Sequence, residues 1–450
     1  MKTKVFASAM AALMAVSALT GCSSETTPNT GNAGTEPVVV ELPDMTEPTT
    51  IEMWHYMSGK QQEALQAIID EFNATNTMNI TVNAVSQGKI VDMNKKVIAA
   101  EQSNTLPAII NVYPDLATGL IEKGDIYDMG AFATHPEVGI LPELENDFIA
   151  PFVAEVSQWD GKLYGMPLTK STEVIYVNKT LLEKLGYTLE DIQGMTMEKL
   201  AEVSKAAKEQ LGIPGFGYDS GSNGFISTLK MDGMNFVELD GTINVDNEWV
   251  RTFMDFYKEQ VQNGYFRTPG EDGYLSGPFS NQQILMYQGS TAGASFLETN
   301  GQFELAVVEP AYFEGKEKAV IQQGGSLFIT NDVSLKEQYA AYEFIKFATS
   351  TENTAKFATE TGYLPVRKSA AETDTVKNVL ADPSLPYAQV YPVAQIALEY
   401  AYYTPAINNA QSARNTIQEK FEAYINGNIA DMNTFIEETV SEVGTSIQRQ

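Results

Sequence analysis

Apart from its acids, this chain has few residues that could do chemistry. His55 and His135 are the only histidines among 450 residues, so a Ser-His-Asp triad or a multi-histidine metal site would need one of them. The nearest match to a nucleophile elbow, G-S-T-A-G at 289–293, has Thr at its centre instead of Ser. The sequence has no phosphate-binding loop, no dinucleotide-binding glycine motif and no calcium loop. We therefore expect a protein that is not an enzyme and that holds no metal and no cofactor.

The carboxylates leave one catalytic alternative open. Aspartate and glutamate together occupy 58 positions, so a pair of acids with glycosidase geometry is expected by chance. A polysaccharide hydrolase is therefore kept as a distant alternative.

Aromatic side chains are better suited to binding than to catalysis. They cluster where segments turn, as at Trp54, at Trp159 with Tyr164, and at 400–403. Ring faces pack against sugar carbons or a choline cation, while nearby polar groups fix the orientation of the ligand. Each ring could equally belong to a core. We expect Trp54 to contact ligand because it stands at the end of the first predicted strand.

The N-terminal residues predict export and anchoring. Lys2 and Lys4 precede an apolar run at 5–19, which is short for a bilayer span and has the form of a signal peptide. The run ends in L-T-G-C, which is similar to the lipobox of bacterial lipoproteins, and Cys22 is the only cysteine. We predict a signal peptide over 1–21, lipidation of Cys22, an extracytoplasmic location on the cell membrane and a flexible Ser/Thr/Pro/Gly-rich tether over 22–50. An ordinary export signal with an incidental cysteine is the alternative.

The charge and length of the chain limit the class of partner and the number of lobes. The formal net charge is −29, which argues against nucleic acid as a partner. A chain of 450 residues exceeds the roughly 250 to 300 residues at which a single core stops growing. We expect two lobes and a monomer.

Hydrophobic periodicity predicts an α/β first lobe. Strands are expected at 51–55, 80–85 and 108–112 and helices at 59–73, 91–101 and 115–123. The apolar residues of the first helix follow the i, i+3, i+4, i+7 pattern at positions 65, 68, 69 and 72. Alternating strands and helices indicate parallel pairing with right-handed crossovers, and ligands collect at the carboxyl ends of such strands.

The stretch at 159–178 predicts a passage between lobes. An Asp-Gly turn lies between short aromatic runs, and a Pro-interrupted segment leads into the alternating V-I-Y-V run at 174–177. We expect Ser171, beside this crossing, to touch a ligand held between the lobes.

Five motifs carry a resemblance to a known family. They are M-W-H-Y-M at 53–57, P-A-I-I-N-V-Y at 107–113, Y-V-N-K at 176–179, G-G-S-L at 324–327 and T-G-Y-L-P at 361–365. With them the body resembles the family 1 extracellular solute-binding proteins of ABC importers, and it looks most like the subgroup that binds glycerol-3-phosphate and glycerophosphodiesters. The resemblance implies two doubly wound α/β lobes of the type II periplasmic-binding-protein class, joined by hinge strands.

The resemblance also implies a domain order. Lobe 1 is expected over 51–168 and again over 306–347, and lobe 2 over 174–305 and 351–450. The chain would then cross between lobes near 168–174, 305–310 and 346–351.

Ligand residues are implied by position in the subgroup's motifs. They are Ser171 after the hinge proline, Ser290, the backbone of Gly324, Tyr363 and Arg414. A guanidinium, two hydroxyls, a phenol and a backbone amide would form an anion site. Three of these residues also have structural alternatives, since Ser290 could bond a turn, Gly324 could permit a bend and Arg414 could pair with a surface acid.

Two positions depart from the subgroup. Its loop tyrosine falls at Ile90, and its acidic ligand for the glycerol hydroxyls falls at Pro114, where Asp115 could replace it after a shift of one residue. The expected function is capture of a glycerophosphodiester or glycerol-3-phosphate for the permease subunits of an ABC importer. An oligosaccharide ligand is the alternative. Whether Lys170 faces the ligand stays open at this stage.

Overall fold

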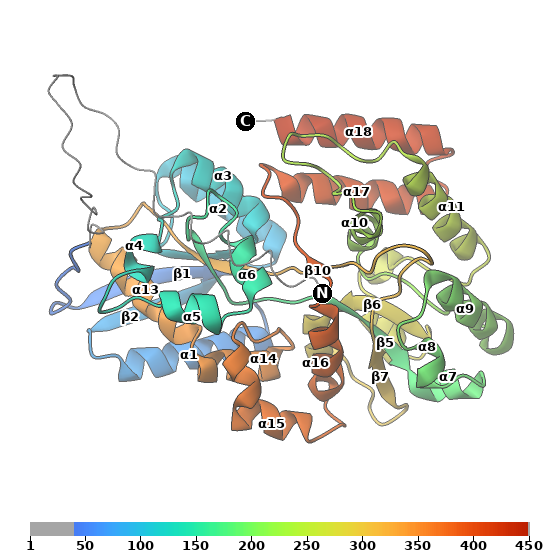
Figure 1. Cartoon of the computed structure of the whole chain (residues 1–450), viewed down its shortest axis with the longest axis horizontal. Helices are drawn as coiled ribbons and strands as arrows, with labels where there is room; N and C mark the ends of the chain where they lie inside the picture. The colour runs from blue at the N-terminus through green and yellow to red at the C-terminus, as the bar shows by residue number, and fades with distance from the viewer. Residues whose placement is uncertain (1–39, 449–450) are drawn as a thin grey trace, which may run out of the picture.

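The larger of the two main sheets forms the core of lobe 1, on the left of Figure 1. The structure is a computed structural model and describes residues 40–448. The strands are hydrogen-bonded in the order β2-β1-β3-β9-β4, with β1 parallel to β2 and β3 and with β9 antiparallel to β3 and β4. Their bounds are β1 (Thr49–His55), β2 (Ile80–Ser86), β3 (Ile109–Val112), β4 (Gly165–Pro167) and β9 (Ser326–Ile329).

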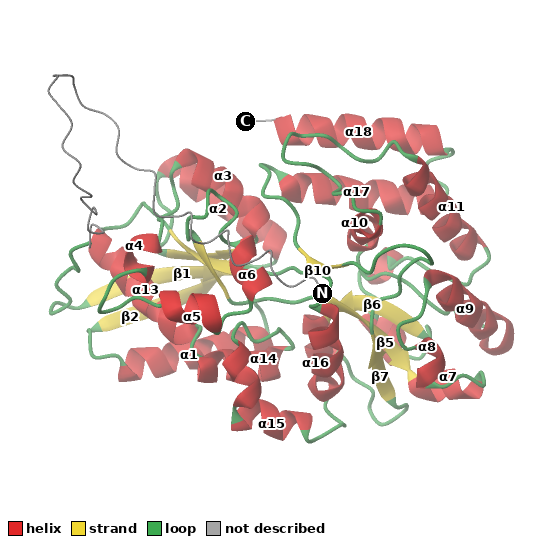
Figure 2. Cartoon of the chain, in the orientation of Figure 1, coloured by secondary structure: helices red, strands yellow, loops and turns green. Residues whose placement is uncertain are grey.

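Helices cover both faces of this sheet (Figure 2). Helices α1 and α13 share a core with Ile51 and Met53 of β1, whereas α2 and α3 pack with Ile110 and Val112 of β3. The predicted apolar stripe of α1 is confirmed, because all four of its residues are buried. The helices of this lobe are α1 (Lys60–Thr75), α2 (Ile90–Ser103), α3 (Pro114–Lys123), α4 (Gly130–Ala133), α5 (Leu141–Asn146), α6 (Ala150–Glu155) and α13 (Leu335–Ala348).

Lobe 2 is built on a smaller antiparallel sheet in the order β6-β5-β7. Every residue of the central strand β5 is buried. The expected α/β class is confirmed, although the main sheet of lobe 2 is antiparallel and not doubly wound. The strands are β5 (Glu173–Asn178), β6 (Met286–Ser290) and β7 (Leu305–Val308). The helices are α7 (Lys179–Lys184), α8 (Leu189–Ile192), α9 (Met197–Leu211), α10 (Gly221–Met231), α11 (Glu248–Gln262), α12 (Ser276–Ser280), α17 (Ala410–Ile425) and α18 (Met432–Gln448), with short 3-10 turns η2 (Gly270–Asp272) and η3 (Thr291–Phe296).

Two antiparallel segments join the lobes. Residues 168–172 run from β4 to β5, and residues 322–325 return from β8 (Val320–Ile321) to β9. The backbones of Ser171 and Gln323 exchange hydrogen bonds of 2.9 Å between these segments. The return therefore lies later than the expected 305–310, because residues 305–308 form β7 and pair with β5.

The last passage is also later than expected. Helix α14 (Thr351–Thr361) still packs on α1 of lobe 1, and Lys356 pairs with Glu71 at 3.0 Å. The chain then runs through η4 (Lys368–Glu372), α15 (Asp374–Leu380) and α16 (Pro386–Ala397), and α16 packs against β5 and β7 of lobe 2. Strand β10 (Ala401–Tyr402) pairs with β8 and leads to α17. Residues beyond 346–351 therefore belong to lobe 1 until after α14.

The N-terminal end of the described chain packs on lobe 1. Val40, Leu42 and Met45 contact its core, so the part of the predicted tether from residue 40 onward is attached to the body. Residues 1–39, with the predicted signal peptide and Cys22, lie outside the described residues. None of the helices within 40–448 combines the length and the apolar character that a membrane span requires.

Candidate ligand site between the lobes

A cavity of about 460 Å³ lies between the lobes and the connecting segments. Lobe 1 contributes the first residue of α2 and the residue that follows β3, and lobe 2 contributes β5, β6, α10, α17 and the loops before α10 and α12. The lining is rich in amide, hydroxyl and carboxylate groups. It consists of Ile90, Tyr113, Ser171, Glu173, Asp219, Ser220, Ser222, Asn223, Gly273, Tyr274, Ser290, Gln323, Gln411, Arg414, Asn415 and Gln418.

A second cavity, of about 10 Å³, adjoins the first one. Both are lined by Tyr113, Gln323 and Arg414. The small cavity adds Asp115 and Gly324. The two cavities together therefore contain five of the predicted site residues, namely Asp115, Ser171, Ser290, Gly324 and Arg414.

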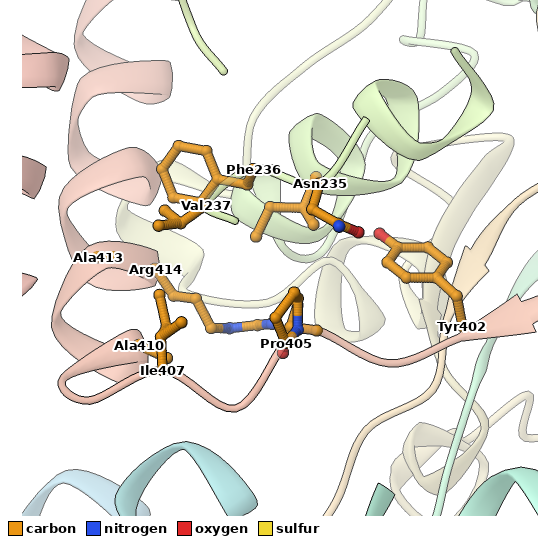
Figure 3. A pocket seen from close by; sticks show the side chains of 11 residues that line it. Asn235, Phe236, Val237, Tyr402, Pro405, Ile407, Ala410, Ala413 and Arg414 are labelled. Atoms are coloured by element: carbon orange, nitrogen blue, oxygen red, sulfur yellow. The ribbon is translucent and has the colours of Figure 1, made fainter. Parts of the chain in front are cut away.

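Arg414 occupies the centre of this arrangement. It lies in the second turn of α17 with 8% of its surface exposed. Its stem runs between Phe236 and Val237 on one side and Ile407 and Pro405 on the other (Figure 3). Its Nη2 donates to Asn223 Oδ1 at 2.5 Å, and no carboxylate of the described residues forms an ion pair with it. Arg414 therefore does not pair with a surface acid, which was its structural alternative.

Asp115 lies in the first turn of α3, directly after the parallel strand β3. Burial raises the pKa of its carboxyl, and the charge of Arg414 opposes that rise. Thr404 of lobe 2 donates to Asp115 Oδ1 at 3.4 Å. Asp115 therefore faces both the small cavity and the opposite lobe.

The two serines line the main cavity in different ways. Ser171 pairs through its backbone with Gln323, and no described residue bonds its hydroxyl. Ser290 ends β6, and its Oγ accepts a hydrogen bond from Ala292 N–H at 3.2 Å. Ser290 therefore bonds a turn, as its structural alternative supposed, and it also lies on the cavity wall. The hydroxyl of Ser171 is available to a ligand.

Gly324 occupies a position that no other residue fits. Its φ of +116° is outside the range of L residues, and an added Cβ would lie 1.7 Å from the carbonyl oxygen of Thr169. Its own carbonyl accepts from Lys170 Nζ at 3.1 Å. No described residue accepts from its N–H, so this backbone donor is free at the edge of the small cavity.

Lys170 does not reach the main cavity. Its side chain is fully buried, and its Nζ lies 2.5 Å from Glu155 Oε2. Burial raises the pKa of Glu155, and Lys170 opposes that rise. Arg414 is therefore the one cationic side chain among the described residues that line the main cavity.

Tyr363 and Trp54 line neither cavity. Tyr363 stacks on Phe357 with ring centroids 5.8 Å apart, and burial together with nearby Tyr113 raises its pKa. The side chain of Trp54 is half-buried against the core beneath α2 and α3, and its indole N–H donates to Glu52, so its contact with a ligand stays a prediction. The alternation along β1 places Trp54 on the same face as the exposed Thr50 and Glu52.

Several cavity residues carry no signal in the sequence. Glu173 is buried and accepts from Asn223 at 2.6 Å and from Gln288 at 2.9 Å. Burial, with a contribution from Glu173, raises the pKa of Asp219 to about 7, while the N–H of Leu275 donates to Asp219 at 2.6 Å and opposes the rise. In a chain with 58 acids, nothing in the sequence marks these two carboxylates.

Two α/β lobes with a polar cavity at their junction define a solute-binding protein, and the comparison with known families agrees. The profile described as "Bacterial extracellular solute-binding protein" matches residues 67–386, so the chain belongs to that family. The predicted resemblance, and the role as the solute-binding component of an ABC importer, are confirmed.

The curated relatives include sn-glycerol-3-phosphate-binding periplasmic proteins UgpB. The protein of Rhizobium meliloti (strain 1021) is 24% identical over 415 residues, covering 89% of this chain and 94% of the relative. The protein of Escherichia coli (strain K12) is 25% identical over 341 residues, covering 72% of this chain and 75% of the relative.

Solved structures show the same fold. UgpB from Mycobacterium tuberculosis in complex with glycerophosphocholine has a TM-score of 0.75 at 19% identity, covering 88% of this chain and 98% of that chain. The cyclic α-maltosyl-1,6-maltose binding protein from Arthrobacter globiformis has a TM-score of 0.73 at 19% identity, covering 89% of this chain and 100% of that chain.

Proposed function

We propose that this protein captures a glycerophosphodiester or glycerol-3-phosphate between its lobes and presents it to the permease of an ABC importer. The observation that carries the proposal is Arg414, a buried guanidinium that forms no ion pair with any carboxylate of the described residues, at the wall of a cavity of about 460 Å³. Glycerol-3-phosphate is also named in the curated relatives, and glycerophosphocholine in one of the structural neighbours.

The donors around Arg414 suit a phosphate group. A guanidinium can hold two phosphate oxygens at once, and its hydrogen bonds to an anion are about twice as strong as neutral ones. The free hydroxyl of Ser171 and the free N–H of Gly324 supply further donors from the connecting segments. Asp115 would accept from the glycerol hydroxyls at the lobe 1 side of the small cavity.

Closure of the lobes would couple binding to transport. Three hydrogen bonds already join the segment before α17 to lobe 1: Thr404 to Asp115 at 3.4 Å, Ala406 N–H to Gln158 at 3.0 Å and Asn408 to Glu122 at 3.2 Å. A ligand that contacts both lobes shifts the equilibrium toward the closed state, because it binds that state better than the open one. The permease would then receive the closed, loaded form.

An oligosaccharide is the second candidate, and the acids of the cavity favour it. When they are ionised, Glu173 and Asp219 oppose an anion, whereas carboxyl, amide and hydroxyl groups together bond neutral hydroxyl groups well. A thermal-shift comparison of glycerophosphocholine with maltotriose separates the two candidates, because a ligand at 100 times its dissociation constant stabilises the fold by roughly 2.7 kcal/mol. A shift with maltotriose alone would overturn the first proposal.

We also propose that the mature protein is a monomer that a lipid on Cys22 holds at the membrane. The L-T-G-C sequence at 19–22 and the absence of any other cysteine support this anchor. Metabolic labelling with a fatty acid tests it, since the wild-type protein should take up label and a Cys22→Ser variant should not. Turnover of a glycoside by the purified protein would support the hydrolase alternative instead.

A further inference from the structure

Residues 403–409 of lobe 2, between β10 and α17, lie against lobe 1. We call this segment the strap. It forms no helix or strand, each of its residues is half-buried, and it runs on the side of lobe 2 that faces α3 (Figure 1). The two connecting segments differ from it, because residues 168–172 and residues 322, 324 and 325 are all buried. Water therefore competes for the hydrogen bonds of the strap more easily than for those of the connecting segments.

Buried hydrogen bonds hold both connecting segments to α6 of lobe 1. Lys170 of the first segment pairs with Glu155 at 2.5 Å. The same ammonium donates to the carbonyl of Gly324 in the second segment at 3.1 Å, and Gln322 of that segment donates to the carbonyl of Pro151 at 3.1 Å. A buried ion pair is costly to break, because a charge would be left without its counter-charge. We therefore expect both segments to stay attached to α6 while the lobes turn about them.

The strap contacts lobe 1 through hydrogen bonds that are partly exposed. The N–H of Ala406 donates to Gln158 Oε1 at 3.0 Å. Asn408 Nδ2 donates to Oε2 of Glu122, on α3, at 3.2 Å. Gln158 lies just after α6, and its Nε2 donates to the carbonyl of Glu155 at 3.0 Å, which fixes the direction of its Oε1. Such bonds contribute little singly, because water replaces them, so they are the contacts that break when the lobes separate.

A glycine on α3 allows this close approach. A Cβ added to Gly119 would lie 3.0 Å from Asn408 Oδ1, which is closer than an ordinary van der Waals contact. The φ of Gly119 is not positive, and glycine is disfavoured inside a helix. The backbone of α3 therefore does not need glycine at this position, whereas the strap needs the space. A larger side chain would hold the strap away from α3.

Two other residues of the strap lie beside Arg414. Pro405 and Ile407 flank its stem and line the cavity of about 20 Å³ next to it (Figure 3). The strap thus contacts lobe 1 and also packs against the side chain that carries the guanidinium. Movement of the strap away from α3 would loosen that packing, so the closure of the lobes and the position of Arg414 are coupled.

We propose that the strap is a latch of the closed form. It fastens lobe 2 to Gln158 and α3, it releases when the lobes turn about the connecting segments, and it supports Arg414 only while it is fastened. Gln158 and Gly119 act as positioning residues, since neither lines the two cavities at Arg414. The inference concerns closure and applies to any ligand that the two lobes enclose, so it does not rest on the identity of the ligand.

Small-angle X-ray scattering of the unliganded protein tests the latch. Gln158→Leu removes the acceptor of the Ala406 N–H, and Gly119→Leu places a side chain against the strap, so both variants should have a larger radius of gyration than wild-type protein. Gln62→Leu, at an exposed position of α1, is the matched control and should scatter like wild-type protein. The midpoint of thermal unfolding of Gly119→Leu should be no lower than that of wild-type protein, because leucine favours a helix more than glycine does.

Stopped-flow kinetics with glycerophosphocholine gives a second measurement. Loss of contacts that exist only in the closed form should raise the dissociation rate about tenfold in both variants, while the association rate stays within about twofold. An unchanged radius of gyration in either folded variant overturns the inference, and so do dissociation rates equal to that of wild-type protein. If wild-type protein does not bind glycerophosphocholine, the proposed function fails, and the scattering alone decides about the latch. Should Gly119→Leu not fold, Gln158→Leu decides.

Discussion

Asn223 holds the guanidinium of Arg414 through its side-chain oxygen at 2.5 Å, while its nitrogen donates to Glu173 at 2.6 Å. One amide thus connects a buried guanidinium to a buried carboxyl group without an ion pair between them. The arrangement fixes the direction of the guanidinium and leaves its other N–H groups for a ligand.

Replacing this amide by a carboxylate tests its role. Asn223→Asp would give Arg414 a permanent counter-charge, so we expect affinity for glycerophosphocholine to fall by about tenfold or more, as measured by titration calorimetry. Asn428→Asp adds the same charge at an exposed position and should leave the affinity unchanged. Equal affinities in the two variants would show that Asn223 does not keep Arg414 available.

The buried ion pair of Lys170 and Glu155 predicts a large stability effect. Glu155→Ala leaves a fully buried ammonium without a counter-charge, so the free energy of unfolding in urea should fall by about 3 to 5 kcal/mol. Glu202→Ala breaks the exposed pair with Lys199 and should cost less than about 1 kcal/mol. A loss of that small size in Glu155→Ala would contradict the structural role assigned to the pair.

Replacing Gly324 should strain the backbone of the two segments that connect the lobes. Gly324→Ala places a Cβ against the carbonyl of Thr169 at a φ of +116°, so either the segments shift or the fold loses more than about 3 kcal/mol. Gly301→Ala has a φ of +69° and open space around its Cβ, and it should cost about 1 to 2 kcal/mol. Thermal unfolding compares the two, and equal costs would show that the contact with Thr169 is unimportant.

The raised pKa of Asp219 should make the free energy of unfolding depend on pH. Because its pKa is about 7 in the folded chain and about 3.9 when unfolded, the folded chain keeps a proton that the unfolded chain loses. The contribution of Asp219 to the free energy of unfolding therefore falls as pH rises from about 4 to about 7.

The same titration affects an anionic ligand in the cavity. Ionised Asp219 repels phosphate, so affinity for glycerophosphocholine should be up to about tenfold higher at pH 6 than at pH 8. The phosphodiester itself does not titrate in this range. Asp219→Asn, which removes the charge and keeps the shape, should show no such difference. A pH dependence that persists in this variant would exclude Asp219 as its source.

The parts of the fold that follow local periodicity could be predicted, and the parts that depend on distant pairing could not. The stripe of α1 and the first three strands are visible in the sequence because each is set by local patterning. Residues 305–308 are a short apolar run whose pairing with β5, over more than a hundred residues, assigns them to lobe 2. Nothing local distinguishes that pairing from a passage to lobe 1.

The residues of the candidate site also divide into those that could be predicted from the sequence and those that could not. Ser171 and Arg414 were predicted from their positions in the family resemblance, after the hinge proline and near the start of a late helix, and both line the main cavity. Trp54 lines neither cavity, and its type and its place near the end of a strand do not reveal which face of β1 it occupies. Glu173 and Asp219 were missed because their neighbours come from β6, α10 and the loop before α12.

The most direct test of the phosphate site is titration calorimetry of Arg414→Ala with glycerophosphocholine and sn-glycerol-3-phosphate. Arg251→Ala, which removes a half-exposed guanidinium paired with Asp246 outside the cavities, serves as the matched control. We predict that Arg414→Ala weakens both ligands by about a hundredfold or more and that Arg251→Ala binds them like wild-type protein. Undiminished affinity in Arg414→Ala would contradict the account.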